Sequence, residues 1–392
     1  MKQPKKLMIP GPVPVWEETL DAMSEQVMSN YTDEFIPIFR DTMNFLHQVF
    51  QTQNDIFVLT SPGSGAIEIG VASLFNRGET VAAISNGPFA GRLIEILRAY
   101  GLTVLEIENE WGKAADLDQV RQALKKAPKV AGVTVVANET GTGVRNPVKE
   151  LAALAHELDL PILVDAVSGM GGYDLPVDKW DLDIVCTSSN KALEIPPGLG
   201  LISVSPRAWA VVDAKQATAT RGWYYNLSTW KQYKELRPDN PSPTTMATSL
   251  IVGLHASLKR MIEGETLAGH WARYAWAQKI VREGLRNIGF EMLVRDEDAS
   301  FTVTAVCKRA DMDHEQEVRD FLAAKHGYLV SGTWGKLTGE AFRISHMGQS
   351  SSPEYLYPFL LGIEDFVRSV KEVDVPVGAS LVGLLERPTY SG

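Results

Sequence analysis

Two charged residues stand at the ends of two predicted buried strands, and together they could support one kind of chemistry. Lys191 follows the run 183–190, an apolar strand that leaves its sheet through small polar residues, and Asp165 ends the apolar run 161–165. A lysine amine can form a Schiff base with an aldehyde, and a carboxylate can keep a pyridinium nitrogen protonated. The pair therefore predicts a site for pyridoxal 5'-phosphate (PLP), with Lys191 and Asp165 as catalytic residues.

The bulk composition is that of an ordinary globular chain of 392 residues, which is long enough for two domains. A net charge of −10 argues against nucleic acid or an anionic membrane as a general partner. Both cysteines, Cys186 and Cys307, lie in strand-like runs, so we expect free thiols and a cytoplasmic location. The first ten residues contain no apolar stretch of the length of a signal peptide, and no 18-residue apolar run occurs, so we expect neither a signal peptide nor a membrane span.

Short β-branched runs alternate with stretches of helical period through the first half of the chain. The runs at 81–84, 103–107, 133–136, 162–164 and 201–204 predict strands, and the stretches at 66–75, 89–100, 117–125 and 148–158 predict helices. This alternation predicts an α/β fold with a mostly parallel sheet flanked by helices. Ligands of such sheets bind beyond the carboxyl ends of the strands, where Lys191 and Asp165 lie.

A second region follows a proline-rich stretch at 237–243 and reads as a smaller α+β domain. Helical stretches at 245–264 and 271–288 precede strands near 301–307 and 342–346 and a closing helix over about 353–373. We expect a large domain over residues 15–250 and a small domain over 251–392, joined by the N-terminal segment 1–14. We do not assign the residues from Asp374 onward to any predicted helix or strand.

The loop 60–68 opens a predicted helix directly after a strand. Its small residues Ser61, Gly63 and Ser64 would let backbone N–H groups and the helix dipole reach a phosphate. The loop matches neither a Walker motif nor a dinucleotide motif, and an ordinary strand-to-helix connection is the alternative interpretation.

Three further residues could surround the ring of a cofactor. Val167 shares a face with Asp165 if that strand continues, and it could then pack against one side of the ring. Phe89 follows the next strand and could stack on the other side, although a core position is the alternative. Thr140 stands in a Gly- and Thr-rich turn and could approach the phenolic oxygen, although simple turn chemistry also explains that stretch.

Arg343 lies in a predicted strand of the small domain, in the run 340–346. A guanidinium fork grips a carboxylate through two hydrogen bonds, and an amino-acid substrate carries a carboxylate. An inter-domain salt bridge is the alternative for Arg343. We expect His346 to be structural or to act behind the site.

Taken together, these motifs resemble the class V aminotransferases, which belong to the fold-type I PLP enzymes. The resemblance is strongest to the alanine–glyoxylate and serine–pyruvate aminotransferase branch, with pyridoxamine–pyruvate aminotransferase as a near relative. It runs from residue 9 to Arg343 and rests on 63–64, 138–140, 165–167, 189–191, 196–198 and Arg343.

The resemblance implies a role for each matching residue. Lys191 would form the Schiff base and Asp165 would hold the ring nitrogen, with Val167 and Phe89 enclosing the ring. The remaining roles are these: Ser61, Gly63, Ser64 and Asn190 near the phosphate, Thr140 near the ring hydroxyl, and Arg343 on the substrate carboxylate. The family is dimeric, so the resemblance also implies a homodimer in which Thr244 of one subunit closes the phosphate site of the other.

The sequence departs from the pattern of the family at several places. Phe89 stands where many relatives have Trp, and Tyr31, a predicted substrate-binding residue, stands where alanine–glyoxylate enzymes usually have His. The stretch before Thr244 lacks the Tyr that some members use on the phosphate. The aromatic run 221–226 could line the site or form part of an interface or core.

We therefore expect an aminotransferase that moves an amino group from a small amino acid, alanine or serine, to a 2-oxo acid, glyoxylate or pyruvate, by a ping-pong mechanism. The alternative is a pyridoxamine–pyruvate aminotransferase, which would not need a phosphate site. A PLP lyase of the desulfurase type is disfavoured because neither Cys186 nor Cys307 is predicted on a loop near the cofactor. A binding protein without catalysis is disfavoured because both Lys191 and Asp165 are present.

Overall fold

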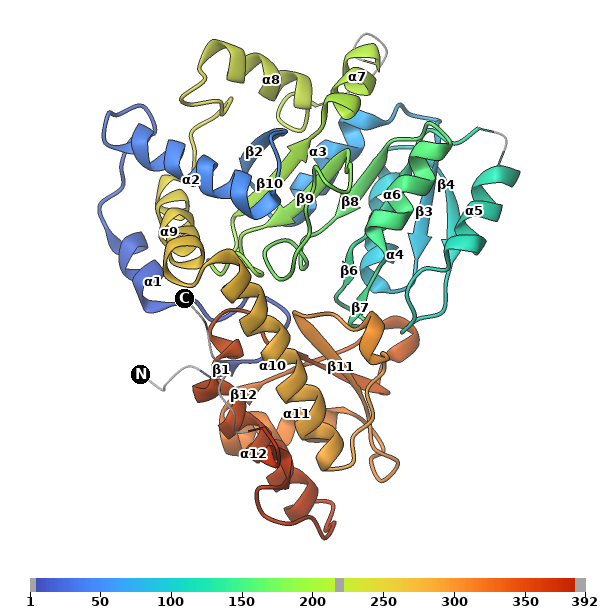
Figure 1. The fold of residues 1–392 in the computed structure, drawn as a ribbon, viewed down its shortest axis with the longest axis vertical. Helices are drawn as coiled ribbons and strands as arrows, with labels where there is room; N and C mark the ends of the chain where they lie inside the picture. Colours follow the sequence, from blue (N-terminus) through green and yellow to red (C-terminus); the bar gives the residue numbers. More distant parts are fainter. Residues whose placement is uncertain (1–4, 128, 216–221, 385–392) are drawn as a thin grey trace.

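A seven-stranded sheet forms the centre of the computed structural model, which describes residues 5–127, 129–215 and 222–384 (Figure 1). In spatial order the strands are β2 (Asp55–Thr60), β10 (Leu199–Val204), β9 (Ile184–Ser188), β8 (Ile162–Asp165), β5 (Val133–Val136), β3 (Thr80–Ser85) and β4 (Thr103–Glu108). All neighbours pair in parallel except around β10, which is antiparallel to both β2 and β9. The predicted α/β fold with a mostly parallel sheet is confirmed.

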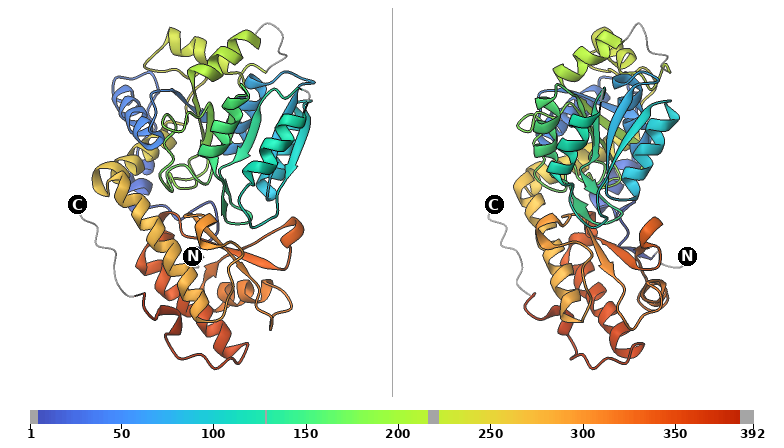
Figure 2. Two further views of the ribbon diagram at one scale, coloured as in Figure 1. Left: turned by 45° about the vertical axis from the view of Figure 1, so that its right-hand side comes forward. Right: turned by 90° about the vertical axis from the view of Figure 1, so that its right-hand side faces the viewer.

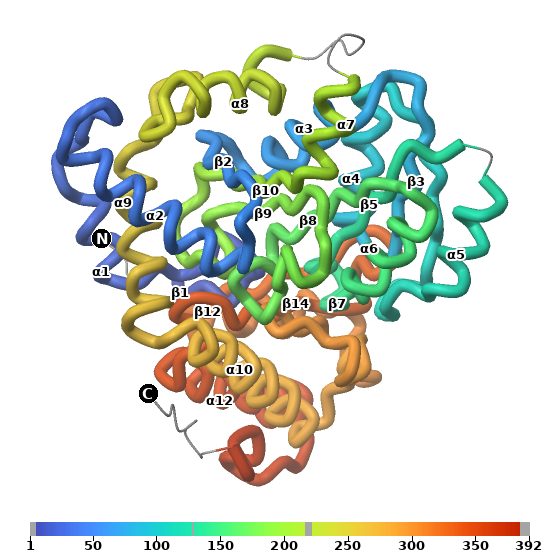
Figure 3. The backbone as a smooth tube through the Cα atoms, turned by 45° about the horizontal axis from the view of Figure 1, so that its top comes forward, coloured from blue at the N-terminus to red at the C-terminus, as the bar shows by residue number. Residues whose placement is uncertain are grey.

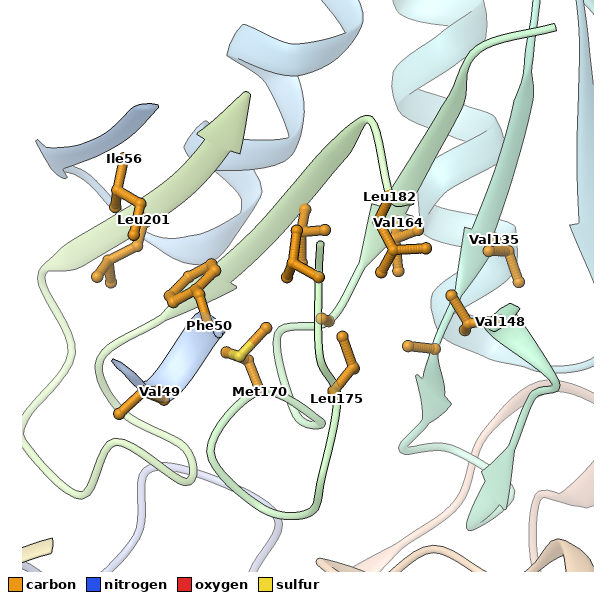
Figure 4. Close-up of a cluster of buried hydrophobic side chains, with 14 of the residues drawn as sticks. Val49, Phe50, Ile56, Val135, Val148, Val164, Met170, Leu175, Leu182 and Leu201 are labelled. Carbon is orange, nitrogen blue, oxygen red and sulfur yellow. The ribbon is translucent and has the colours of Figure 1, made fainter. Parts of the chain in front are cut away.

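Helices cover both faces of this sheet, as Figure 2 shows in its right-hand view. One face packs on α3 (Gly63–Leu74), α4 (Pro88–Ala99), α7 (Pro206–Lys215) and α8 (Leu227–Leu236). The other packs on α2 (Phe35–Phe50), α5 (Leu117–Lys126), α6 (Val148–Glu157) and α9 (Thr248–Lys259). Neighbours along β8 alternate between the two cores, with Leu163 in one cluster and Val164 in the other. Figure 4 shows Val164 among the side chains of its cluster. Burial on both faces explains why the inner strands are largely apolar, whereas the edge strand β4 is mostly exposed and contains Glu106 and Glu108.

The C-terminal region lies beneath the carboxyl ends of the large sheet (Figures 1 and 3). It contains α10 (Leu267–Asn287), β11 (Val303–Cys307), α11 (Gln316–Phe321), β13 (Ser331–Gly332), β14 (Ala341–Ser345) and α12 (Pro353–Ser369). Strand β14 pairs antiparallel with β11 and β13, and β1 (Lys6–Leu7) pairs in parallel with β12 (Tyr328–Leu329). The N-terminal segment therefore runs along this region. The proposed domain boundary at 250/251 stays a prediction and falls within α9.

Several predicted elements differ at their ends from the observed ones. The strand that carries Asp165 ends there, and Val167 begins a turn, so the strand period does not set the direction of Val167. Helix α3 starts at Gly63 rather than near residue 66, and α12 ends at Ser369. After Asp374 the chain returns to α12, where Ser380 donates to Glu364 at 2.7 Å through its hydroxyl. No helix in the described ranges is long and apolar enough to cross a membrane.

Glu194 joins distant parts of the chain at one buried point. Its Oε1 accepts hydrogen bonds from Tyr274 Oη at 2.5 Å and Arg273 Nη2 at 3.0 Å. Its Oε2 accepts from Trp16 Nε1 at 2.7 Å and from Arg260 Nη2. Burial alone would raise the pKa of Glu194, but the charges of Arg273 and Arg260 hold that pKa well below its usual range. The carboxylate therefore stays charged and fully paired.

The same cluster connects the turn after β9 to the C-terminal region. Glu194 adopts a left-handed backbone conformation (φ 60°), and its N–H donates to Lys191 O at 2.9 Å. On the other side of the cluster, Arg273 Nη1 donates to Gly348 O at 3.1 Å, and Tyr274 Oη accepts from Gly348 N at 3.0 Å. Glu194 thus fixes the backbone of the lysine turn against the region below it.

Replacing Glu194 by Gln should lower the free energy of unfolding by about 3–5 kcal/mol, because the buried Arg273 and the half-buried Arg260 lose the charge that balances them. Since folding lowers the pKa of Glu194, its contribution is present above the ordinary pKa of 4.5 and is lost only in stronger acid. Urea denaturation at pH 7 measures the loss. Glu263→Gln, which removes an exposed partner 3.9 Å from Lys259, is the control and should change little. Equal effects of the two substitutions would contradict this account.

Candidate active site

Lys191 lies in the turn between β9 and β10, at the carboxyl edge of the large sheet. Its Nζ donates to Pro10 O, and Gly11 packs so closely on the amine that a Cβ there would overlap it. Gly11 has φ +130°, a conformation that glycine adopts without strain. Burial, together with the charge of Arg343, lowers the pKa of Lys191 to about 8. The amine therefore lies enclosed under the N-terminal segment.

Asp165 ends the neighbouring strand β8 and is 6% exposed. Its Oδ1 accepts a hydrogen bond from Val167 N at 2.9 Å. Burial raises the pKa of Asp165 to about 6, although the positive charges of Arg92 and Lys191 act against that rise. A carboxylate held this way lacks a full set of partners and would be stabilised by a cationic N–H group.

Glu139, which the sequence analysis did not identify as a site residue, is fully buried beside the start of α4. Its carboxylate accepts from the backbone N–H groups of Phe89 at 3.2 Å, Ala90 at 2.9 Å and Gly141 at 2.8 Å. Burial raises its pKa to about 7. Glu139 thus caps α4 and fixes the backbone of Phe89. A lone carboxylate after a buried strand was the signal in the sequence, because such a group needs buried donors.

The N-terminus of α3 lies against the end of β9. Ser188 Oγ is buried and has no hydrogen-bond partner among the described residues. A Cβ on Gly63 would lie 2.9 Å from Ser188 Cβ and 3.0 Å from Val167 Cγ2, so only glycine fits between them. An unpaired hydroxyl beside a helix N-terminus is suited to an anionic oxygen. Ser188 was missed in the sequence, although it shares a strand face with Cys186, which contacts α3 through Ala66 O.

Two more hydroxyl groups approach the first turn of α3. A Cβ on Gly65 would lie 2.8 Å from Ser61 Oγ and 2.9 Å from Tyr225 Oη. Ser61 Oγ donates to Pro62 O at 3.1 Å. Tyr225 belongs to the aromatic run 221–226, of which Arg221 lies outside the described residues. The predicted phosphate residues Ser64 and Asn190 are both half-buried.

Arg343 is 6% exposed and is held by two carbonyl groups. Its Nε and Nη2 donate to Gly332 O at 2.9 and 2.8 Å, and its Nη1 donates to Thr140 O at 3.2 Å. A guanidinium has five N–H groups, so one N–H on each Nη has no partner among the described residues. Burial lowers the pKa of Arg343 to about 10, which leaves it charged at neutral pH. A guanidinium with N–H groups free on both Nη atoms can donate two hydrogen bonds to one carboxylate.

The side chains of Thr140 and His346 are hydrogen-bonded to other residues of the protein. Thr140 Oγ1 is hydrogen-bonded to Ser168 Oγ at 2.5 Å. His346 is buried, with its Nε2 3.1 Å from Thr304 Oγ1, and burial lowers its pKa to about 3. His346 is therefore neutral at physiological pH and packs as a structural residue.

Tyr31 and Thr244 lie outside the group around Lys191. Tyr31 is 56% exposed, and its hydroxyl accepts from Arg237 Nη1 at 3.2 Å. Thr244 lies against Tyr224, whose hydroxyl accepts from Thr60 N at 3.1 Å. Tyr31 and Thr244 would therefore act at a surface of this chain, and only if a second subunit covers that surface.

The described site residues fit PLP. The pieces they supply are an enclosed amine, a buried carboxylate in need of a cation, a helix N-terminus with an unpaired hydroxyl, and a free guanidinium fork. A parallel sheet with these groups at its carboxyl edge defines a PLP-dependent enzyme of fold-type I.

The comparisons with known proteins identify the family. Residues 16–342 match the family model "Aminotransferase class-V", so the chain belongs to the class V aminotransferases and is a PLP-dependent aminotransferase. It is 34% identical to an uncharacterised aminotransferase of Methanocaldococcus jannaschii, over 96% of this chain and 97% of that protein.

Two solved structures are also similar. The ureidoglycine–glyoxylate aminotransferase of Bacillus subtilis has a TM-score of 0.90 at 28% identity and covers 98% of both chains. The pyridoxamine–pyruvate aminotransferase of Mesorhizobium loti has a TM-score of 0.89 at 28% identity, over 97% of this chain and 96% of that one. The predicted family, fold, enzyme class and cofactor are confirmed.

Replacing Asp165 by Asn should stabilise the cofactor-free protein at about pH 8. Folding raises the pKa of this acid from 3.8 to about 6, so the wild type loses stability as the pH rises through that window. The Asp165→Asn variant keeps this stability, which amounts to a free energy of unfolding on the order of 2–3 kcal/mol. Thermal melting of both cofactor-free proteins should give a higher Tm for the variant at about pH 8 and no such gain below about pH 4. A gain of the same size at both pH values would contradict the burial of an unpaired carboxylate.

Proposed function

We propose that the enzyme transfers the amino group of a small amino acid, alanine or serine, to a 2-oxo acid, glyoxylate or pyruvate, in a ping-pong reaction. The observation that carries this proposal is the grouping of Lys191, Asp165 and Arg343. Asp165 pairs with Cys186 on β9, the strand that leads to Lys191, and Arg343 donates to Thr140 O in the turn that follows β5. These contacts place the three groups at the carboxyl edge of the large sheet, where the charges of Asp165 and Arg343 also affect the pKa of Lys191. A nucleophilic amine, an acceptor for a ring N–H and a carboxylate fork are the parts that transamination requires.

Lys191 would attach the cofactor and would later move a proton at the substrate Cα. Bound PLP supplies an aldehyde and an electron-accepting ring. With a pKa of about 8, Lys191 presents a fraction of free amine near neutral pH, as a nucleophile and a general base need. The N-terminal segment over the amine would exclude water from it.

Asp165 would hold the ring nitrogen in its protonated form through charge. Ser188 and the N–H groups of α3 would bind the phosphate, beside the predicted residues Ser61, Gly63, Ser64 and Asn190. Phe89, fixed by the Glu139 cap, and Val167 would enclose the ring, and Thr140 would lie near its hydroxyl.

The unpaired hydroxyl of Ser188 favours a phosphorylated cofactor over free pyridoxamine as the group bound at α3. Burial raises the pKa of Cys186 and of Cys307, so neither thiol is activated for desulfurase chemistry. Cys186 also donates from β9 to Ala66 O of α3 at 3.1 Å.

A half-reaction screen tests the proposed function. The cofactor absorbance of the purified enzyme is followed after addition of alanine, serine, other amino acids or free pyridoxamine, without a 2-oxo acid. Alanine or serine should convert the cofactor fastest. Conversion by pyridoxamine alone would support the alternative reaction and contradict the proposal.

Arg343→Lys should raise KM for amino acids and 2-oxo acids roughly 10- to 100-fold, because lysine keeps the charge but loses the fork. PLP binding should change little. The matched control is Arg309→Lys, which affects an arginine paired with Asp311 on the surface of the C-terminal region. If decarboxylated amines react with the wild type as well as amino acids do, Arg343 does not bind the substrate carboxylate.

We further propose a homodimer in which Tyr31 and Thr244 serve the site of the partner subunit. An exposed Tyr31 cannot contribute to an enclosed site in its own subunit. The exposed apolar side chains Val27, Trp223 and Leu236, which are 69%, 56% and 66% exposed, favour a covered surface near it.

Subunit mixing tests this arrangement. The variants Lys191→Ala and Thr244→Ala should each be impaired, and a mixture of the two should regain activity after dissociation and reassociation. The reason is that each heterodimer would contain one intact site, with Lys191 from one subunit and Thr244 from the other. An active monomer in light scattering would contradict the proposal.

A further inference from the structure

The segment 333–338 crosses from the C-terminal region to the large sheet. Thr333 Oγ1 donates to Leu337 O at 2.6 Å, which closes the segment into a compact turn. Lys336 Nζ lies 2.8 Å from Glu108 Oε1, at the end of β4. Gly335 packs on Trp111, where a Cβ would lie 2.8 Å from the indole ring. These contacts attach the segment to the end of β4 and to Trp111.

This segment carries Trp334 into the space between two proposed site residues. The Cζ atom of Arg343 lies 4.7 Å from the centroid of the Trp334 ring. The Phe89 and Trp334 centroids are 5.2 Å apart, with the rings at 70°. Trp334 is 37% exposed, so its indole lies at the opening of the site.

We propose that Trp334 determines which substrate side chains the enzyme accepts, by forming the wall between the carboxylate site at Arg343 and the ring site at Phe89. This inference rests on the proposed function, because it needs Arg343 to bind the substrate carboxylate. A substrate bound to Arg343 and reacting beside Phe89 must place its Cα substituent next to the indole.

Two physical effects of the indole lead to this selection. Its face covers one side of the guanidinium, which holds the plane of the two free N–H groups of Arg343. The indole is also large and rigid, and it contacts both Phe89 and Arg343. A longer Cα substituent therefore meets a fixed wall. One methylene too many in a confined apolar site costs roughly 10- to 200-fold in selectivity.

Unreactive carboxylates of increasing chain length test the wall without turnover. Acetate, propionate, butyrate and pentanoate are titrated calorimetrically into the PLP-loaded wild type and into Trp334→Ala, Trp334→Phe and Arg343→Lys. The control is Trp276→Leu, which removes a tryptophan that packs on Tyr357 between α10 and α12. The same proteins are assayed by kcat/KM with alanine and with norvaline.

In the wild type, affinity should fall from acetate to pentanoate. Trp334→Ala should raise the pentanoate-to-acetate affinity ratio and the norvaline-to-alanine kcat/KM ratio by at least about 10-fold. Trp334→Phe should lie between the two, and Trp276→Leu should leave both ratios unchanged. Arg343→Lys should weaken all four carboxylates alike.

An unchanged ratio in Trp334→Ala, with normal folding by circular dichroism, would overturn the inference while leaving the proposed function intact. The same ratio change in Trp276→Leu would also overturn it, because the effect would then be a general loss of packing. A wild type that binds none of the carboxylates would contradict the role of Arg343 and, with it, this inference.

Discussion

The site depends on one buried ionic cluster, in which the carboxylate of Glu194 lies between Arg260 and Arg273. Lys191 lies in an irregular turn, and such a turn needs contacts with other parts of the chain to fix its position. The cluster supplies what the turn lacks: the Glu194 N–H binds Lys191 O, and the side chain of Arg273 reaches the loop at Gly348. Because the donors come from Trp16, from Arg260 and from the adjacent pair Arg273 and Tyr274, losing the central carboxylate would loosen several contacts at once.

The ionisable groups of the proposed site are buried at a cost in stability. Burial raises the pKa of Asp165 to about 6 and of Glu139 to about 7, and lowers that of Lys191 to about 8. Each shift shows that the fold disfavours the charged form. Perturbed pKa values of this kind are typical of functional sites, where a bound ligand supplies the missing interactions. Ser188, with its unpaired hydroxyl, belongs to the same pattern.

The sequence predicted the large sheet well because its inner strands are buried on both faces and read as largely apolar runs, although the edge strand β4 is mostly exposed. Lys191 and Asp165 were recognisable because a charged residue at the end of a buried apolar strand needs a partner for its charge. Glu139 carried the same kind of signal and was overlooked. Glu194 and Trp334 were not recognisable as site residues, since their importance comes from approaches between segments far apart in the chain. The alternation rule failed at Val167 because the strand ends at Asp165.

The most direct test of the account is to locate the lysine that carries the cofactor. The PLP-loaded enzyme is reduced with borohydride and digested, and the modified peptide is identified by mass spectrometry. The account predicts a pyridoxyl group on Lys191 and on no other lysine, together with loss of the yellow colour in Lys191→Ala before reduction. A modified lysine elsewhere in the chain, with Lys191 unmodified, would contradict the assignment on which the proposed site rests.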